Sequence, residues 1–221
     1  DTDLSITDPN DAQPSLKNEG LITFKDVSYH YPKASENVLN NISFTARPGE
    51  TTAIIGSTGS GKSTLINLIP RFYDVTDGAI EIDGIDIRKM TQADLRANIG
   101  YVPQKGMLFS GNIVSNIAYG KDDASTDEIM KALEVAQAKN FVSEMEDGIE
   151  TAIAQGGGNV SGGQKQRLSI ARALVKKAPI YIFDDSFSAL DFKTDAALRS
   201  ALDAYTDNAT VLIVAQRIST I

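Results

Sequence analysis

The stretch ETTAIIGSTGSGKSTLINLI, residues 50–69, decides the fold. A β-rich run at 50–55 leads into a glycine-rich loop, and a helical segment then follows from Gly61 until Pro70 stops it. The loop matches the phosphate-binding pattern G-x-x-x-x-G-K-[ST], and the flanking strand and helix are the context that this pattern requires. A glycine-rich turn without a ligand is the alternative interpretation.

The residue types in this loop suit a phosphate ligand. Glycines let successive backbone N–H groups turn inward toward phosphate oxygens, and the start of the helix presents its positive end to the same anion. Lys62 can reach the β- and γ-phosphates of a nucleotide, and Ser63 can coordinate Mg²⁺. The predicted phosphate-binding residues are Gly56, Ser57, Thr58, Gly59, Ser60, Gly61, Lys62 and Ser63.

A second apolar run, Ile180–Phe183, ends in two carboxylates, Asp184 and Asp185. In a chain that also has a phosphate loop, an aspartate in this position is expected to hold the Mg²⁺ hydration shell. We therefore predict that Asp184 serves the metal. A strand followed by an ordinary acidic turn is the alternative.

A further helix start has the composition of an anion site. Ser161 is a good N-cap, and Gly162 and Gly163 leave the first amides of the following helix accessible next to Gln164. The alternative is a capped helix with no ligand.

The remaining pattern indicates a mainly parallel α/β sheet with an antiparallel layer built from the early strands, because these strands lack intervening helices. Alternating or continuous apolar runs predict strands at 22–29, 38–46, 50–55, 79–82, 99–102, 180–183 and 210–214. Apolar stripes at helical spacing, with a capping signal at Thr91, predict helices at 61–69, after 91, and around 129–136, 168–175 and 198–205.

Residues 1–20 contain two prolines, five acids and few large apolar groups. We expect them to be a linker or tail, and we expect ordered structure to begin near Leu21.

Composition excludes several classes of function. The chain has 221 residues, no cysteine and one histidine, which excludes a disulfide scaffold, a thiolate metal site and a multi-histidine metal site. Its formal net charge of −8 argues against a nucleic-acid partner bound through a basic face. No apolar run approaches the ~18 residues of a membrane span, and the N-terminus has no signal-peptide pattern.

Taken together, these motifs resemble the nucleotide-binding domain of an ATP-binding cassette (ABC) transporter over residues 21–221. Gly56–Thr64 is similar to the Walker A motif of that family, 180–184 to its Walker B motif, and 161–164 to its signature motif. Val160 stands where the family has a leucine before the signature serine. The resemblance adds Thr64 to the nucleotide-binding residues.

The resemblance assigns roles to three further residues. Gln104 matches the Q-loop glutamine, which links Mg²⁺ and the attacking water to the membrane domain. Asp191 matches the D-loop aspartate at the dimer interface, and Tyr31 takes the place of the aromatic side chain that stacks on adenine. A core position for Tyr29 and Tyr31 is the alternative.

The implied architecture is a P-loop NTPase (RecA-like) core with an antiparallel β layer and an inserted α-helical subdomain at about 105–176. The stretches 71–74 and 104–113 are closest to the exporter branch of the family. There, two such domains close head to tail around two molecules of ATP with Mg²⁺, each held by the phosphate loop of one domain and the signature of the other. The coupling helices of a transmembrane domain are the further partner, no nucleic acid is involved, and the place is the cytoplasmic face of the cell membrane. The resemblance also implies that a membrane domain precedes residue 1 and that the C-terminal end is trimmed.

Two departures from the family pattern affect hydrolysis more than binding. Asp185 stands where the family has a glutamate, and Gln216 stands where it has a histidine; the sole histidine is His30. The aspartate carboxylate is drawn back by roughly 1 Å, and misplacement on that scale can cost about 10²-fold in rate. Glutamine hydrogen-bonds but carries no positive charge toward the leaving phosphate.

These departures resemble the degenerate half of a heterodimeric exporter. On this hypothesis the chain's own ATP site is hydrolysis-poor, while its signature completes the active site of a partner that has the glutamate and histidine. Residues 151–157 also lack both glutamates of the T-E-V-G-E-R-G segment of many exporters, which puts contact with the opposite membrane domain in doubt. Two alternatives remain, a slow self-sufficient homodimeric ATPase and a soluble ABC protein outside transport. The exporter-like stretches and the acidic charge argue against the second.

Overall fold

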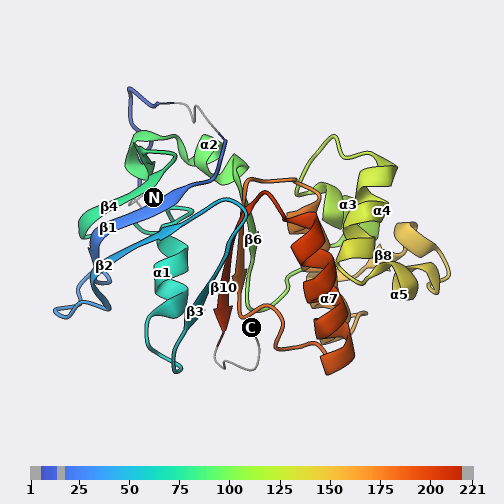
Figure 1. Cartoon of the computed structure of the whole chain (residues 1–221). Helices are drawn as coiled ribbons and strands as arrows, with labels where there is room; N and C mark the ends of the chain where they lie inside the picture. The colour runs from blue at the N-terminus through green and yellow to red at the C-terminus, as the bar shows by residue number, and fades with distance from the viewer. Residues whose placement is uncertain (1–5, 14–17, 216–221) are drawn as a thin grey trace. The chain divides into compact units, whose positions relative to one another are not determined.

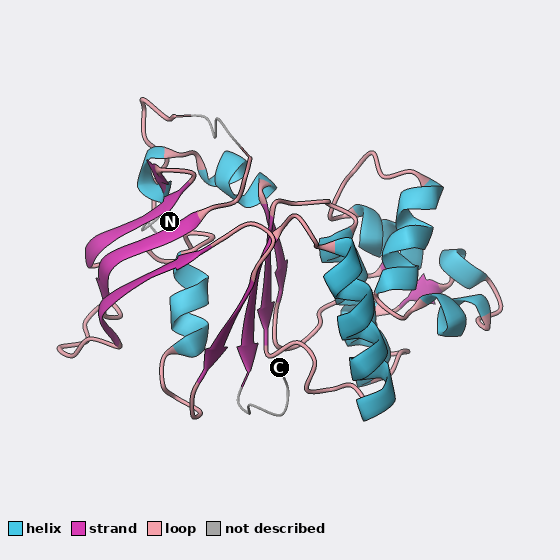
Figure 2. Ribbon diagram, in the orientation of Figure 1, coloured by secondary structure: helices cyan, strands magenta, loops and turns pink. Residues whose placement is uncertain are grey.

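Strands predominate in one part of the chain and helices in the other (Figures 1 and 2). The computed structural model describes residues 6–13 and 18–215. The chain divides into two units: the first comprises residues 1–99, 179–184 and 208–221, and the second comprises residues 100–178 and 185–207. In the described ranges, no helix combines the length and the apolar character that crossing a membrane requires.

The early strands of the first unit form the expected antiparallel layer. Phe24 lies opposite Phe44 in this sheet, and their rings stack with centroids 4.5 Å apart. A bulge after Phe24 places Asp26 at φ +48°, so the alternation of buried and exposed side chains shifts within the first strand. The strands, in sheet order, are β2 (Leu39–Ala46), β1 (Ile22–Tyr29), β4 (Asp77–Ile82) and β5 (Ile85–Asp86).

The expected parallel strands are also present in the first unit. β10 (Thr210–Ala215) lies between β3 (Thr51–Ile55) and β9 (Ile180–Asp184), and it is parallel to both. All residues of β9 and β10 are buried, as expected for strands with both faces covered. The carboxyl ends of parallel strands meet at one edge of a sheet, so the loop after β3 and the end of β9 share that edge. The short helix α1 (Lys62–Leu68) begins after that loop.

The N-terminal segment differs from the prediction that ordered structure begins near Leu21. The Asp8 carboxylate accepts hydrogen bonds from Gln92, the first residue of α2 (Gln92–Ala97), and the Gln13 N–H donates to the Lys89 carbonyl at 2.7 Å. Composition did not indicate these contacts because they depend on partners about 80 residues away.

The second unit contains the periodic helices predicted from the sequence, and side chains cap most of them. Capping boxes begin α3, α4 and α6, with Asn112, Ser125 and Ser161 as the respective N-caps. Its helices are α3 (Ile113–Ala118), α4 (Thr126–Val135), α5 (Lys139–Ser143), α6 (Gly162–Leu174) and α7 (Phe192–Tyr205). Its short strands β7 (Gly111–Asn112) and β8 (Ala152–Ile153) pair antiparallel, and β6 (Ile99–Val102) begins where the chain leaves the first unit.

Gly120, which follows α3, permits a close approach to α6. A Cβ atom at this position would lie 2.1 Å from the Arg172 carbonyl oxygen and 3.1 Å from Val175 Cγ1. Gly158 offers a comparison, since a Cβ there would meet nothing nearer than 3.9 Å.

We predict that Gly120→Ala lowers the free energy of unfolding by about 1–3 kcal/mol, because the backbones must move apart. Gly158→Ala should change it by less than about 0.5 kcal/mol. Equilibrium denaturation followed by circular dichroism measures both values. Equal effects of the two substitutions would contradict this account of the α3–α6 contact.

Candidate functional site

The loop between β3 and α1 has a backbone that only glycines adopt easily. Gly59 has φ +80° and Gly61 has φ +89°, both in the left-handed region. Gly61 is the N-cap of α1 and no side chain caps that helix. A Cβ on Gly56 would lie 2.7 Å from Ser60 Oγ, so a larger residue would crowd the loop. The loop therefore leaves its amides at the helix start free of a side-chain cap, as an anion cradle requires.

The Lys62 ammonium group lies over this loop. Its Nζ donates to the carbonyl oxygens of Gly56 and Ser57, both at 2.6 Å, and to Ser60 Oγ at 3.3 Å. A cation beside a glycine-rich loop at a helix start is complementary in charge to a phosphate group. The residues present therefore fit a nucleotide phosphate.

Ser63 and Asp184 meet although 121 residues separate them in the chain. Ser63 Oγ donates to Asp184 Oδ1 at 3.0 Å, and Asp184 is 7% exposed at the end of β9. A hydroxyl and a carboxylate are hard oxygen ligands of the kind that Mg²⁺ prefers. Across the described ranges no group of three histidine, cysteine or acidic residues could hold a metal. The donor set therefore fits a Mg²⁺ ion that takes its remaining ligands from phosphate oxygens and water.

Tyr31 and Tyr29 have different surroundings. Tyr29 is 3% exposed, and burial raises the pKa of its hydroxyl to about 12. Tyr31 is 37% exposed, packs edge-on against Tyr29 and Tyr73, and shares a 2.8 Å hydrogen bond between its hydroxyl and Thr64 Oγ1. The core alternative therefore holds for Tyr29, whereas Tyr31 offers an accessible ring beside α1. His30 contacts its neighbour, with Nδ1 3.1 Å from the Tyr31 carbonyl oxygen.

In the second unit, Gln104 Nε2 donates to Asp185 Oδ2 at 3.4 Å. Asp185 has φ +45°, a left-handed backbone that aspartate tolerates better than most residues. Gln166 holds the loop on both sides of Gln104, since its Oε1 accepts from Gly106 N–H at 2.7 Å and its Nε2 donates to the Pro103 carbonyl at 3.1 Å. Sequence reasoning missed Gln166, because it lies outside the apolar stripe of α6 and carries no motif signal of its own.

The start of α6 is organised by a reciprocal cap. Ser161 Oγ accepts from Gln164 N–H at 3.2 Å, and Gln164 Oε1 accepts from Ser161 N–H at 3.0 Å. The amides of Gly162 and Gly163, at the first two helical positions, are beyond the reach of any carbonyl of the same helix. A Cβ on Gly162 would meet nothing within 4 Å, so this helix start is open to a ligand.

Asp191 also has a structural role that the sequence analysis did not assign. It is the N-cap of α7, where Oδ1 accepts from Thr194 N–H at 2.9 Å and Oδ2 accepts from the Thr194 hydroxyl at 2.7 Å. These bonds from Thr194 lower the pKa of the Asp191 carboxyl. The D-x-x-T spacing at 191–194 was the signal for this cap. Gln216, which the sequence analysis assigned to hydrolysis together with Asp185, lies outside the described residues.

The candidate residues fall into two groups. The phosphate loop, Asp184 and Tyr31 belong to the first unit, and Gln104, Asp185, Asp191 and residues 161–164 belong to the second.

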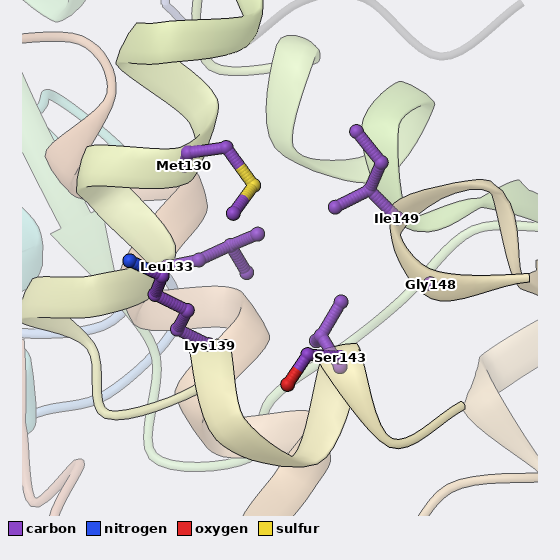
Figure 3. Close-up of a pocket in the computed structure, with 7 residues that line it drawn as sticks. Met130, Leu133, Lys139, Ser143, Gly148 and Ile149 are labelled. Carbon is purple, nitrogen blue, oxygen red and sulfur yellow. The ribbon is translucent and has the colours of Figure 1, made fainter.

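The second unit also has a cavity of about 250 Å³ beside α4 and α5, lined by Met130, Leu133, Val142 and Ile149 among others (Figure 3). Lys139 and Ser143 also line it, but the surface that faces the cavity is apolar, unlike that of a phosphate site.

Comparison with known proteins gives consistent matches. The sequence model of the family described as "ABC transporter" matches residues 39–188. An uncharacterized ABC transporter ATP-binding protein of Mycobacterium tuberculosis is 51% identical over 203 residues, which cover 90% of this chain and 34% of that protein. An ATP-dependent lipid A-core flippase of Thiobacillus denitrificans is 47% identical over 204 residues, which cover 92% of this chain and 35% of that protein.

A solved structure, described as a bacterial Atm1-family ABC exporter with ATP bound, superimposes with a TM-score of 0.95 at 40% identity. It covers 100% of this chain, which covers 38% of that protein. The P-loop NTPase fold predicted from the motifs, with its antiparallel layer and helical part, is thereby confirmed. The chain spans about a third of the length of the curated relatives it matches.

Proposed function

The chain belongs to the ABC transporter family, and on that premise we propose that it binds Mg-ATP and pairs head to tail with a second nucleotide-binding domain to drive an exporter. The observation that carries the proposal is the Ser63–Asp184 hydrogen bond directly behind a phosphate loop that Lys62 covers. That arrangement places a cation, Lys62, next to the proposed metal ligand Ser63 in α1, with Asp184 at the end of β9 as the second ligand.

Different residues of the chain are proposed to bind the phosphates, the metal ion and the adenine ring of ATP. The amides of residues 56–64 and the Lys62 ammonium group bind the phosphates, and Ser63 and Asp184 hold Mg²⁺, which neutralises phosphate charge when bound. Tyr31 stacks on the adenine ring. Its partial exposure and the hydrogen bond between its hydroxyl and Thr64 Oγ1 support this role, because the ring is accessible and fixed in orientation.

The same site is proposed to be poor in hydrolysis. Asp185 has a shorter side chain than the glutamate of the family pattern, and Gln104 already donates to its carboxylate. Gln216 replaces the histidine that would carry positive charge toward the leaving phosphate. Binding is retained, because the phosphate loop, Ser63 and Asp184 are all intact.

The signature of this chain would serve the partner's ATP. The open start of α6, where a Cβ on Gly162 would meet nothing within 4 Å, supports contact with a phosphate presented by another domain. Asp191 would lie at the interface between the two domains. We therefore propose a heterodimer in which the partner supplies the glutamate and histidine, with both domains attached to transmembrane coupling helices at the cytoplasmic face of the membrane.

The phosphate loop assignment predicts that Lys62→Ala weakens ATP binding by roughly 10- to 100-fold, the equivalent of one lost charge-assisted hydrogen bond. Lys89→Ala is the matched control, because Lys89 is exposed and outside the loop. Isothermal titration calorimetry of the purified chain measures both affinities. Unchanged affinity in Lys62→Ala would remove the assignment.

The degenerate-site assignment predicts very slow turnover by the purified chain and a substantial increase in the double variant Asp185→Glu, Gln216→His. We expect about 10²-fold, the scale of rate lost to a misplaced group. Asp203→Glu with Gln155→His controls for the same chemical changes at exposed positions. Phosphate release from ATP measures the rates. A turnover near ~10 s⁻¹ for the unmodified chain would contradict the degenerate-site assignment.

A further inference from the structure

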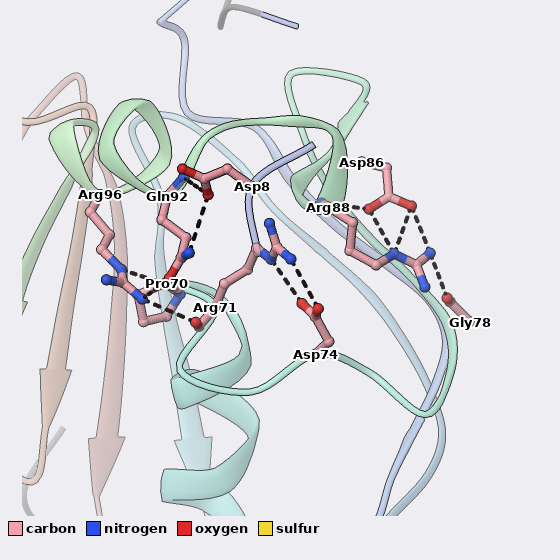
Figure 4. A network of polar contacts seen from close by, with 9 residues as sticks. All are labelled: Asp8, Pro70, Arg71, Asp74, Gly78, Asp86, Arg88, Gln92 and Arg96. Carbon is pink, nitrogen blue, oxygen red and sulfur yellow. Dashed lines mark hydrogen bonds and ion pairs between the residues drawn. The ribbon is translucent and has the colours of Figure 1, made fainter. Parts of the chain in front are cut away.

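Residues 6–13, here called the strap, are attached to the first unit at two points. Asp8 Oδ1 accepts from the Gln92 backbone N–H at 2.9 Å and from Gln92 Nε2 at 3.1 Å (Figure 4). The Gln13 N–H donates to the Lys89 carbonyl. One carboxylate oxygen thus receives both donors of a single residue, which fixes the strap against the start of α2.

The other end of the same Gln92 amide faces a cation. Gln92 Oε1 accepts from Arg96 Nη2 at 3.0 Å, so the amide donates to a carboxylate on one side and accepts from a guanidinium on the other. Figure 4 shows the three side chains in this order. Charges of opposite sign at the two ends polarise the amide in one direction, which strengthens both hydrogen bonds.

Arg96 continues the chain of contacts to the turn that follows α1. Its Nε donates to the Pro70 carbonyl at 2.9 Å and its Nη2 to the Arg71 carbonyl at 3.1 Å. Its guanidinium also lies over the Phe72 ring, 5.4 Å from the centroid.

This turn needs support from outside. Arg71 has φ +53°, a left-handed conformation that is costly for a residue with a Cβ, and such a conformation persists only where surrounding contacts hold it. The Arg71 side chain is 3% exposed and forms a two-pronged ion pair with Asp74, at 2.8 and 2.9 Å. Arg96 donates to the carbonyls of Pro70 and Arg71, which belong to the two peptide bonds that flank the strained Arg71 Cα. A displacement of the Arg96 side chain would therefore weaken the contacts that hold the turn.

We propose that Asp8, Gln92 and Arg96 form a polar relay that couples the strap to the turn ending α1, the helix whose first turn carries Lys62 and Ser63. Gln92 is the positioning residue at its centre. The relay stands on contacts within the first unit and does not depend on the proposed function. The hydrogen bonds from Gln92, backbone first and then side chain, lower the pKa of the Asp8 carboxyl, and attraction to Arg71 and Arg96 adds to this. Asp8 is therefore charged at neutral pH.

Amide hydrogen exchange of the full chain, resolved by residue, tests the relay. The Arg71 N–H donates to the Leu68 carbonyl and the Phe72 N–H to the Asn67 carbonyl, so both amides report on the turn. Asp8→Ala should speed exchange at these two amides roughly five- to tenfold, the effect of one lost hydrogen bond. Gln92→Met, which keeps the chain length but neither polar end, should do the same.

Two comparisons make the test decisive. Asp11→Ala removes an exposed acid from the same strap and should leave exchange at 71 and 72 unchanged. The double variant Asp8→Ala, Gln92→Met should exchange no faster than Gln92→Met alone, because the relay is already broken. Faster exchange confined to the strap in Asp8→Ala, an additive double variant, or an equal effect of Asp11→Ala would each overturn the proposal.

Discussion

The hydrogen bond from Ser63 to Asp184 is the interaction on which the proposed nucleotide site of the first unit depends. It joins the first turn of α1 to the end of β9, and it exists because β3, β10 and β9 run parallel and therefore end at one edge of their sheet. The register that pairs Val214 with both Ile54 and Asp184 brings the end of β9 level with the strand that leads into the phosphate loop. The left-handed backbone at Gly59 and Gly61 then turns the chain into α1, whose first two residues are Lys62 and Ser63.

The consecutive residues Asp184 and Asp185 illustrate how two neighbouring carboxylates acquire different roles. Asp184 completes a buried strand and accepts from Ser63, while Asp185 turns with a left-handed backbone and meets Gln104. We propose that the first contact forms the metal-ligand pair, while the second places Asp185 beside Gln104. The proposal of a site that binds ATP but hydrolyses it poorly rests on this difference, because Asp184 is present while Asp185 has a shorter side chain than a glutamate.

Much of the fold could be predicted because the longer elements carry a clear period. The alternation at 22–29, the apolar runs at 180–183 and 210–214, and the stripes of α4, α6 and α7 all correspond to observed elements. Two-residue strands such as β7 and β8 could not be predicted, since two residues have no period. The phosphate loop was recognised from its glycines, but the Tyr31–Thr64 bond, the Gln166 contacts and the Asp8–Gln92–Arg96 relay were not, because each depends on which distant segment becomes a neighbour.

The magnesium dependence of ATP binding tests the central claim most directly. ATP affinity would be measured with Mg²⁺ and with EDTA in the unmodified chain, in Asp184→Asn, and in Asp203→Asn as an exposed control. The account predicts that Mg²⁺ tightens binding to the unmodified chain and the control, and that Asp184→Asn removes this gain while it leaves the affinity in EDTA unchanged. An Asp184→Asn variant that keeps the full gain from Mg²⁺ would contradict the assignment of the Ser63–Asp184 pair as the metal site.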